Sequence, residues 1–208
     1  MPLEWKAPQN LFADRQNVTG VFETIYQRNV WGGGSGAGSN PQIARPYMMF
    51  LQAFLQNNLI RSVVDIGCGD WQFSQHINWG DRTYLGIDVV SSVIEQNKQR
   101  FARPNISFLC TNPLEESFAA PSGDLLLLKD VLQHLSNANA KKLLELAKRF
   151  KFALITNAYA PMNDDCENGD TRPLDIRAEP FNIRHAALVY GFNEKAMFLV
   201  VQPELFAG

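Results

Sequence analysis

The stretch VVDIGCGDWQF, residues 63–73, decides the fold. It opens with β-branched and apolar residues that suit a buried strand. Gly67 and Gly69 then turn the chain and let a ligand approach the backbone closely. The apolar spacing that follows predicts a helix over residues 71–79. A strand, a glycine turn and a helix N-terminus together form a cradle of outward-pointing amide groups.

The composition predicts an ordinary soluble protein. The chain has 208 residues and a formal net charge of −2, enough for one α/β domain with its own core. We see no basic stripe that would bind nucleic acid, no apolar run near the roughly 18 residues of a membrane span, and no signal peptide. Three scattered cysteines without a CxxC pair favour a reduced, cytoplasmic location over a disulfide framework or a zinc site. We expect a monomer or homodimer that binds a small molecule and neither nucleic acid nor a membrane.

Strands and helices alternate along most of the chain. Strands are expected at residues 61–66, 83–88, 106–110, 124–129, 152–156, 186–190 and 196–202. Helices are expected at residues 21–29, from 41 onward, 89–101 and 138–150. This alternation predicts an α/β fold with a doubly wound, Rossmann-like sheet. The turn GFNEK joins the last two strands as a hairpin, so at least one strand is antiparallel.

Two further features complete the organisation. A helical cap or lid segment, residues 1–58, precedes a core of residues 59–208, and we expect both to form one compact domain. A polar loop, residues 157–184, replaces a helix between the fifth and sixth strands. We interpret this loop as a lid that binds the substrate.

The glycine turn does not suit a dinucleotide. Such a turn needs G-x-G-x-x-G, but Gln72 stands at the third position beside the large Trp71, which disfavours a nicotinamide oxidoreductase. Asp65, two residues before Gly67, can accept a hydrogen bond from an amine and would repel a pyrophosphate. The ligand is therefore expected not to be a polyphosphate.

Two strand tips suit an adenosine. Asp88 ends the second expected strand, where a carboxylate can bind both ribose hydroxyls. Its alternative role is the N-cap of the next helix. Asn112 and Pro113 follow the third strand, where a polar tip can recognise an adenine amino group or can be an ordinary turn.

These segments resemble the class I S-adenosylmethionine-dependent methyltransferases. VVDIGCGD resembles their first motif, YLGID their acidic second motif, and DLLLLKDVLQHL their strand-four motif. The resemblance covers roughly residues 60–202 and implies S-adenosylmethionine as cofactor. It implies a seven-stranded sheet of order 3-2-1-4-5-7-6 with strand 7 antiparallel. The cofactor-binding residues implied in these segments are Asp65, Gly67, Cys68, Gly69, Asp88, Val89, Asn112, Pro113 and Lys129.

A narrower resemblance involves both ends of the chain. IYQRNVWGGGSGAGS and NGDTRPLDIRAEPFNI are similar to segments of a bacterial methyltransferase group found among cell-surface polysaccharide or small-metabolite clusters. Taken alone, the glycine-rich residues 31–41 predict a flexible linker; the resemblance instead implies an N-terminal helical lid over the cofactor. Arg45 is expected to pair with the methionine carboxylate. The lid residues implied are Trp31, Ser35, Gly36 and Ser39.

Candidate catalytic residues follow the fourth strand. Methyl transfer from a sulfonium is an in-line displacement, and an acceptor hydroxyl must also lose a proton. Asp130 and His134 are spaced i and i+4, so they share a helix face if this turn is helical. His134 is the candidate base, or a histidine bonded to a backbone carbonyl. Asp130 is expected to orient His134 or to contact the substrate.

Candidate acceptor-binding residues lie in the polar loop. Arg172 can clamp a phosphate or carboxylate, and Asp164 and Asp165 add hydrogen-bond acceptors. These carboxylates with Asp130 are a weaker alternative as a divalent-metal site, and we expect no metal.

The sequence thus predicts O-methylation of a small polar acceptor, such as a sugar or a phosphorylated or acidic metabolite. An N-methyltransferase and an inactive, cofactor-binding regulatory relative are the alternatives.

Overall fold

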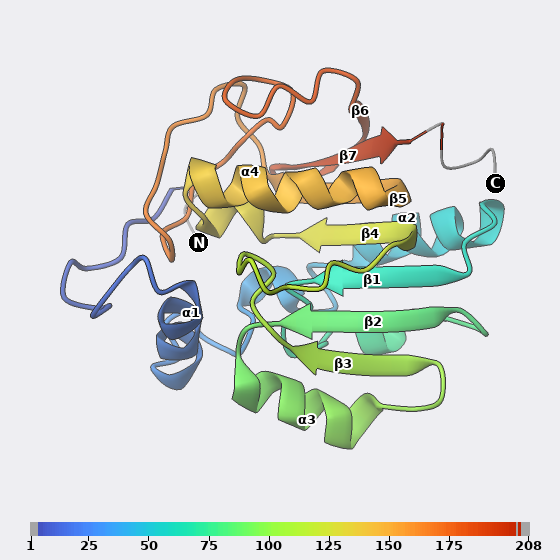
Figure 1. Ribbon diagram of the computed structural model, residues 1–208, viewed down its shortest axis with the longest axis horizontal. Coiled ribbons are helices and arrows are strands. Elements are labelled where there is room, and N and C mark those ends of the chain that lie inside the picture. Colours follow the sequence, from blue (N-terminus) through green and yellow to red (C-terminus); the bar gives the residue numbers. More distant parts are fainter. Residues whose placement is uncertain (1–3, 203, 205–208) are drawn as a thin grey trace.

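A seven-stranded sheet forms the centre of the molecule (Figure 1). The computed structural model describes residues 4–202 and 204. The strand order is β3-β2-β1-β4-β5-β7-β6; β1 to β5 pair in parallel, and β7 is antiparallel to β5 and β6. The predicted fold class, strand order and antiparallel strand 7 are confirmed. The strands are β1 (Ser62–Ile66), β2 (Thr83–Asp88), β3 (Ile106–Cys110), β4 (Gly123–Lys129), β5 (Phe150–Ala158), β6 (Ala187–Phe192) and β7 (Lys195–Val201).

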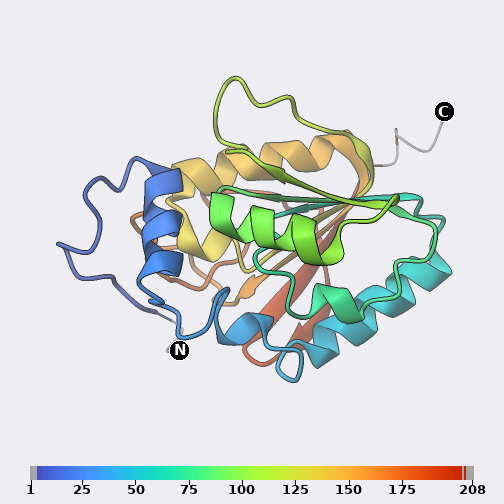
Figure 2. The same cartoon turned by 90° about the horizontal axis from the view of Figure 1, so that it is seen from below.

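Helices cover both faces of the sheet. Figure 2 shows α4 on one side of the sheet and α2 and α3 on the other. The α-helices are α1 (Val18–Gln27), α2 (Arg45–Asn57), α3 (Ser91–Phe101) and α4 (Asn137–Glu145). Short 3-10 helices occupy Ala37–Ser39, Ser74–His76, Leu132–His134 and Leu146–Arg149.

The central strands are buried on both faces, which explains their unbroken apolar sequences. Leu126 packs in one cluster with Leu143 of α4, and Leu127 packs in a second cluster with Leu51 of α2. Alternate residues of a strand point to opposite faces, so β4 supplies both cores. Among the described residues, no helix is long and apolar enough to cross a membrane.

The helix predicted over residues 71–79 is wrong. Only Ser74–His76 forms a short 3-10 turn. Trp71 has a left-handed backbone, with φ of 58°. A right-handed helix cannot begin at a residue with this backbone conformation. Its buried indole Nε1 donates to the Tyr84 hydroxyl at 2.9 Å and its ring contacts Phe108. Aromatic packing against the sheet thus overrides the local apolar spacing, and no helix N-terminus follows the glycine turn.

The segment between β5 and β6 contains no helix in the described structure, as expected, but much of it is packed coil rather than a solvated loop. Leu174 and Ile176 are fully buried in the core. Thr171 pairs with Trp5 through two backbone hydrogen bonds of 2.7 and 2.9 Å, so the N-terminal segment crosses this coil.

Several segments of the chain meet at the edge of the sheet where the parallel strands end. The parallel strands all end there, α1 lies beside it, and β7 begins there (Figure 1). Lys195, the first residue of β7, pairs with Ala158 at the end of β5. Ligands of open α/β sheets bind at this carboxyl edge.

Candidate active site

A cavity of about 340 Å³ opens at the carboxyl edge of the sheet. Its walls come from the glycine turn, the tips of β2 to β5, α1 and the glycine-rich segment. The structure brings most of the predicted site residues to this cavity. Those that line it are Trp31, Ser35, Gly36, Ser39, Asp65, Gly67, Cys68, Gly69, Asp88, Val89, Asn112, Pro113, Lys129, Asp130 and His134.

The glycine turn requires its glycines. Gly67 and Gly69 have φ of 75° and 55°, which only glycine adopts without cost. A Cβ on Gly67 would lie 2.4 Å from Val131 Cγ2, and one on Gly69 would lie 2.2 Å from Ser35 Oγ. The loop after β4 and the glycine-rich segment therefore pack directly on the turn.

Asp88 connects the tip of β2 to the glycine turn. Its Oδ2 accepts from Gly69 N at 3.0 Å and its Oδ1 accepts from Val90 N at 3.1 Å. Burial raises the pKa of Asp88, although these backbone hydrogen bonds oppose that shift. Each carboxylate oxygen has a second lone pair for a ligand hydroxyl.

Asp65 is the second buried carboxyl group of the cavity. Burial raises its pKa to about 6, while a hydrogen bond from the Tyr84 hydroxyl and the charge of Lys129 oppose the rise. The Tyr84 hydroxyl lies 2.7 Å from Asp65 Oδ2. The carboxyl is thus held in place to accept a hydrogen bond from a cationic group.

The glycine-rich segment is anchored to the turn. Ser35 Oγ donates to Asp70 Oδ1 at 2.7 Å, and Asp70 N donates to Ser35 Oγ at 2.9 Å. The Tyr26 hydroxyl lies 2.6 Å from the same Oγ. These contacts favour a lid over a linker. Sequence reasoning missed Tyr26 and Asp70, although Asp70 directly follows the glycine turn.

His134 is held from both ring nitrogens. Gln133 Oε1 accepts from Ala158 N, which turns the Gln133 amide nitrogen toward His134 Nε2 at 3.2 Å. His134 Nε2 is then the acceptor, so Nδ1 carries the proton and donates to the Asp170 carbonyl at 2.9 Å. Thr171 Oγ1 lies 3.1 Å from Nδ1. Burial lowers the pKa of His134 to about 4, so the ring is neutral at pH 7.

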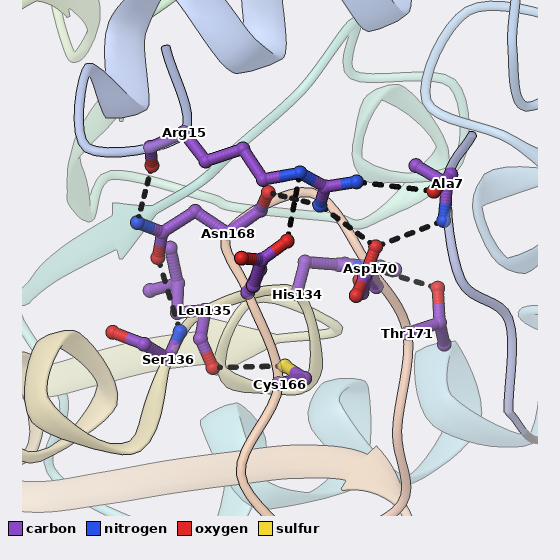
Figure 3. Close-up of polar contacts among 10 residues, drawn as sticks. Ala7, Arg15, His134, Leu135, Ser136, Cys166, Asn168, Asp170 and Thr171 are labelled. Atoms are coloured by element: carbon purple, nitrogen blue, oxygen red, sulfur yellow. Dashed lines mark hydrogen bonds and ion pairs between the residues drawn. The ribbon is translucent and has the colours of Figure 1, made fainter. Parts of the chain in front are cut away.

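An arginine from the N-terminal segment fixes the carbonyl that His134 contacts (Figure 3). Arg15 Nη1 donates to Asp170 Oδ1 at 2.9 Å, and Ala7 N donates to the same oxygen at 2.9 Å. Asn168 Nδ2 donates to the Arg15 carbonyl at 2.8 Å. The coil behind His134 is therefore part of the site, and no motif indicated it.

Asp130 contacts two lysines. Its Oδ2 accepts from Lys129 Nζ at 2.7 Å and from Lys195 Nζ. Burial alone would raise the pKa of Asp130, but the two ammonium groups outweigh it and lower the pKa to about 2. The expectation that Asp130 and His134 share a helix face is wrong, because Asp130 has φ of 58° and only Leu132–His134 forms a short 3-10 turn.

Two polar atoms in the cavity wall lack a partner. Within the described residues, Asp130 Oδ1 and Trp31 Nε1 are buried without a hydrogen bond. The Trp31 ring lies 4.8 Å from the His134 ring, centroid to centroid. Buried polar atoms are rarely left unsatisfied, so both are candidates to contact a ligand.

Three predicted binding residues lie elsewhere. Arg45 is exposed at the first residue of α2, and Asp164 and Asp165 are exposed in the coil; none lines the cavity. Asp165 Oδ1 instead accepts from Asn137 N at 2.7 Å, next to the start of α4. These carboxylates do not join Asp130, and among the described residues no cluster of three potential ligands suits a metal ion.

Arg172 is also outside the cavity lining. It is 4% exposed, and it donates to the carbonyls of Leu132 and Leu135 at 3.3 and 3.1 Å and to Asn137 Oδ1 at 2.7 Å. The proposed clamp for an acceptor anion is thus a brace for the loop after β4. The cavity is instead lined by two lysines, Lys129 and Lys195. No sequence motif indicated Lys195.

Replacing Arg172 with Met should lower the free energy of unfolding by about 2 kcal/mol, because three acceptors, two of them buried carbonyls, lose a charged donor. Urea unfolding followed by circular dichroism measures this change. Arg45→Met, at an exposed arginine, is the matched control and should change stability by less than about 0.5 kcal/mol. Equal stability of the two variants would contradict the bracing role.

Comparisons with known proteins agree with this geometry. Residues 63–151 match the family described as a methyltransferase domain. A search of curated proteins finds no matching sequence.

Solved structures with the same fold include methyltransferases. N-methyltransferase NodS from Bradyrhizobium japonicum WM9, solved with S-adenosyl-L-homocysteine, has a TM-score of 0.59 at 17% identity, covering 79% of this chain and 89% of that one. An O-methyltransferase family protein from Burkholderia thailandensis has a TM-score of 0.57 at 15% identity, covering 78% and 56%. A Pyrococcus horikoshii OT3 protein also scores 0.57 at 15% identity, covering 77% and 92%. These likenesses show the fold.

The matched residues run from β1 into β5 and carry the glycine turn, Asp88 and Asp130. Residues 63–151 are therefore similar to a methyltransferase domain, and the cofactor of that family is S-adenosylmethionine.

Proposed function

We propose that this protein transfers a methyl group from S-adenosylmethionine to a small polar acceptor. The observation that carries the proposal is the joining of Asp88 to the amide of Gly69 inside one cavity. This contact joins Asp88, the predicted ribose-binding residue, to the glycine turn. Both lie at the edge of the sheet where open α/β folds bind their ligands.

Several parts of the cofactor have a proposed partner among the cavity residues. Asp88 would accept from the ribose hydroxyls and Asn112 would contact the adenine. Asp65 would accept from the methionine ammonium group. The lid residues Trp31 and Ser35 would cover the cofactor and exclude water. The reactive methyl group would then face the loop after β4, where Asp130 and His134 lie.

An oxygen acceptor remains our first candidate, with a restriction on its chemistry. His134 Nε2 already accepts from Gln133 Nε2, so a base would require the Gln133 side chain to turn away. An acid whose oxygen is ionised in solution needs no base. This favours an acidic metabolite over a neutral sugar within the predicted class.

A nitrogen acceptor is the second candidate, and the same hydrogen bond favours it. An unprotonated amine attacks through its own lone pair and loses its proton to water after transfer. An inactive, cofactor-binding relative would bind cofactor but transfer no methyl group to any acceptor. A cytoplasmic location and a monomeric or homodimeric state remain predictions.

Calorimetric titration with S-adenosylhomocysteine, with NADH in parallel, tests the cofactor assignment. We expect micromolar binding of S-adenosylhomocysteine and no binding of NADH, because Gln72 occupies the place of the third glycine. Binding of NADH alone would contradict the proposal and return the glycine turn to the dinucleotide class.

A further inference from the structure

The ion cluster at the end of β4 contains a lysine with unused hydrogen-bonding capacity. Lys129 Nζ donates to Asp130 and to the carbonyl of Gly38, and it lies over the Phe73 ring at 4.9 Å. Lys195 Nζ has three N–H groups, and within the described residues Asp130 is its one hydrogen-bond partner. Lys195 therefore has donors to spare, and it lines the cavity.

The backbone of Lys195 lies away from the expected cofactor site, and its ammonium group extends to Asp130 at the end of β4. Asp65, Asp88 and Asn112 follow β1, β2 and β3, in one half of the sheet. Lys195 begins β7, three strands away from β1 in the order β1-β4-β5-β7. At about 4.8 Å per strand, its backbone is about 14 Å from the line of β1. Lys195 also lies outside residues 63–151, the part that matches the methyltransferase domain family.

In the described part of the chain, Lys195 has no carboxylate partner of its own, because it shares Asp130 Oδ2 with Lys129. Lys129 also interacts with the charge of Asp65. Glu194, the other acid at this end of the cavity, is exposed at the hairpin turn. The Lys195 side chain is only 15% exposed, and an ammonium group this far from water favours a compensating anion.

The lid covers this cluster. A Cβ on Gly38 would lie 2.9 Å from Asp130 Oδ2 and 3.0 Å from Lys195 Nζ. The lid backbone thus rests against the cluster, and a group bound by Lys195 would be enclosed with the cofactor.

We propose that Lys195 binds an anionic group of the methyl acceptor, a carboxylate or a phosphate. The acceptor is then an acidic small molecule whose charged group sits over β5 and β7. Asp130 positions the ammonium group that binds it. This inference rests on the proposed methyl-transfer function and narrows its substrate class.

The test uses the protein saturated with S-adenosylhomocysteine, which is then titrated with inorganic phosphate and with malonate by calorimetry. We expect wild type to bind one of these anions, and Lys195→Met to bind it at least tenfold more weakly. Lys195→Arg keeps the charge and should bind within about threefold of wild type. Lys98→Met removes an exposed lysine as the matched control and should change nothing. Circular dichroism confirms that each variant is folded.

Three outcomes would overturn the inference. Failure of wild type saturated with S-adenosylhomocysteine to bind either anion would show that Lys195 does not bind the acceptor's charged group. Equal anion binding by wild type and Lys195→Met would place the anion elsewhere. The third outcome is a tenfold loss of S-adenosylhomocysteine affinity in Lys195→Met with no loss for 5′-methylthioadenosine, which lacks the amino-acid portion. Lys195 would then bind the cofactor's own carboxylate.

Failure of the proposed function gives a different result. In that case wild type would either not bind S-adenosylhomocysteine or, as an inactive relative, bind it and transfer no methyl group, whatever residue stands at position 195.

Discussion

Asp88→Ala should weaken the binding of S-adenosylhomocysteine by tenfold to about a hundredfold. Hydrogen bonds to a charged group contribute about 1.5–3 kcal/mol, which corresponds to this range. The variant loses the predicted ribose contact and also the acceptor of the Gly69 amide, so the glycine turn is held less firmly. Isothermal titration calorimetry at pH 7.5 measures the affinity.

Asp124→Ala is the matched control. Asp124 and Asp88 are both 9% exposed, and Asp124 Oδ2 accepts from the backbone amides of Arg61 and Ser62 at 2.7 and 3.1 Å. It lies near the beginning of β4, at the opposite edge of the sheet from the cavity. Its loss should reduce stability but leave the affinity within twofold of wild type. Unchanged affinity in Asp88→Ala, or an equal loss in both variants, would contradict ribose binding by Asp88.

The parts of the site that the sequence predicted are those with local causes. Apolar, β-branched residues specify the strands, and Gly67 and Gly69 end β1 with backbone angles that few other residues adopt. Parallel strands end at one edge, so Asp65, Asp88 and Asn112 had to meet there once the strand order was predicted. The ends of the strands place these three residues without any side-chain contact.

The parts that the sequence did not predict depend on contacts between distant segments. Lys195 meets Asp130 across 65 positions, and Asp170 meets Arg15 across 155. No periodicity reports such a contact. Arg172 shows the opposite error, because an arginine in a polar segment suits ligand binding and buried bracing equally well. Only its burial against the loop after β4 decides between them.

His134→Gln should remove a loss of stability that wild type suffers in acid. The folded protein binds this proton only below about pH 4, whereas the unfolded chain binds it below the ordinary value of 6.5. The group is thus neutral in both states at pH 7.5, and the unfolded state alone gains a proton as the pH falls. Between pH 6.5 and 4.5 the free energy of unfolding should fall by roughly 3 kcal/mol, from about 2 pH units at about 1.4 kcal/mol each.

Asp65 acts in the opposite direction over nearly the same window. Its folded pKa of about 6 exceeds the ordinary 3.8, so the folded protein gains the proton first and stability rises as the pH falls. The two effects partly cancel in wild type. The measurement is therefore the difference between wild type and His134→Gln in the free energy of unfolding, from urea titrations at pH 7.5 and 4.5.

His185→Gln, at an exposed histidine, is the control and should follow wild type at both pH values. The His134 variant should lose less stability in acid than either, because Gln gains no proton in the unfolded chain. Parallel losses in all three proteins would mean that His134 takes up its proton near its ordinary pKa while folded. A histidine that titrates there is available as a base, and the restriction to ionised or amine acceptors would no longer hold. The stability of the folded protein in acid therefore reports on which acceptors the site can methylate.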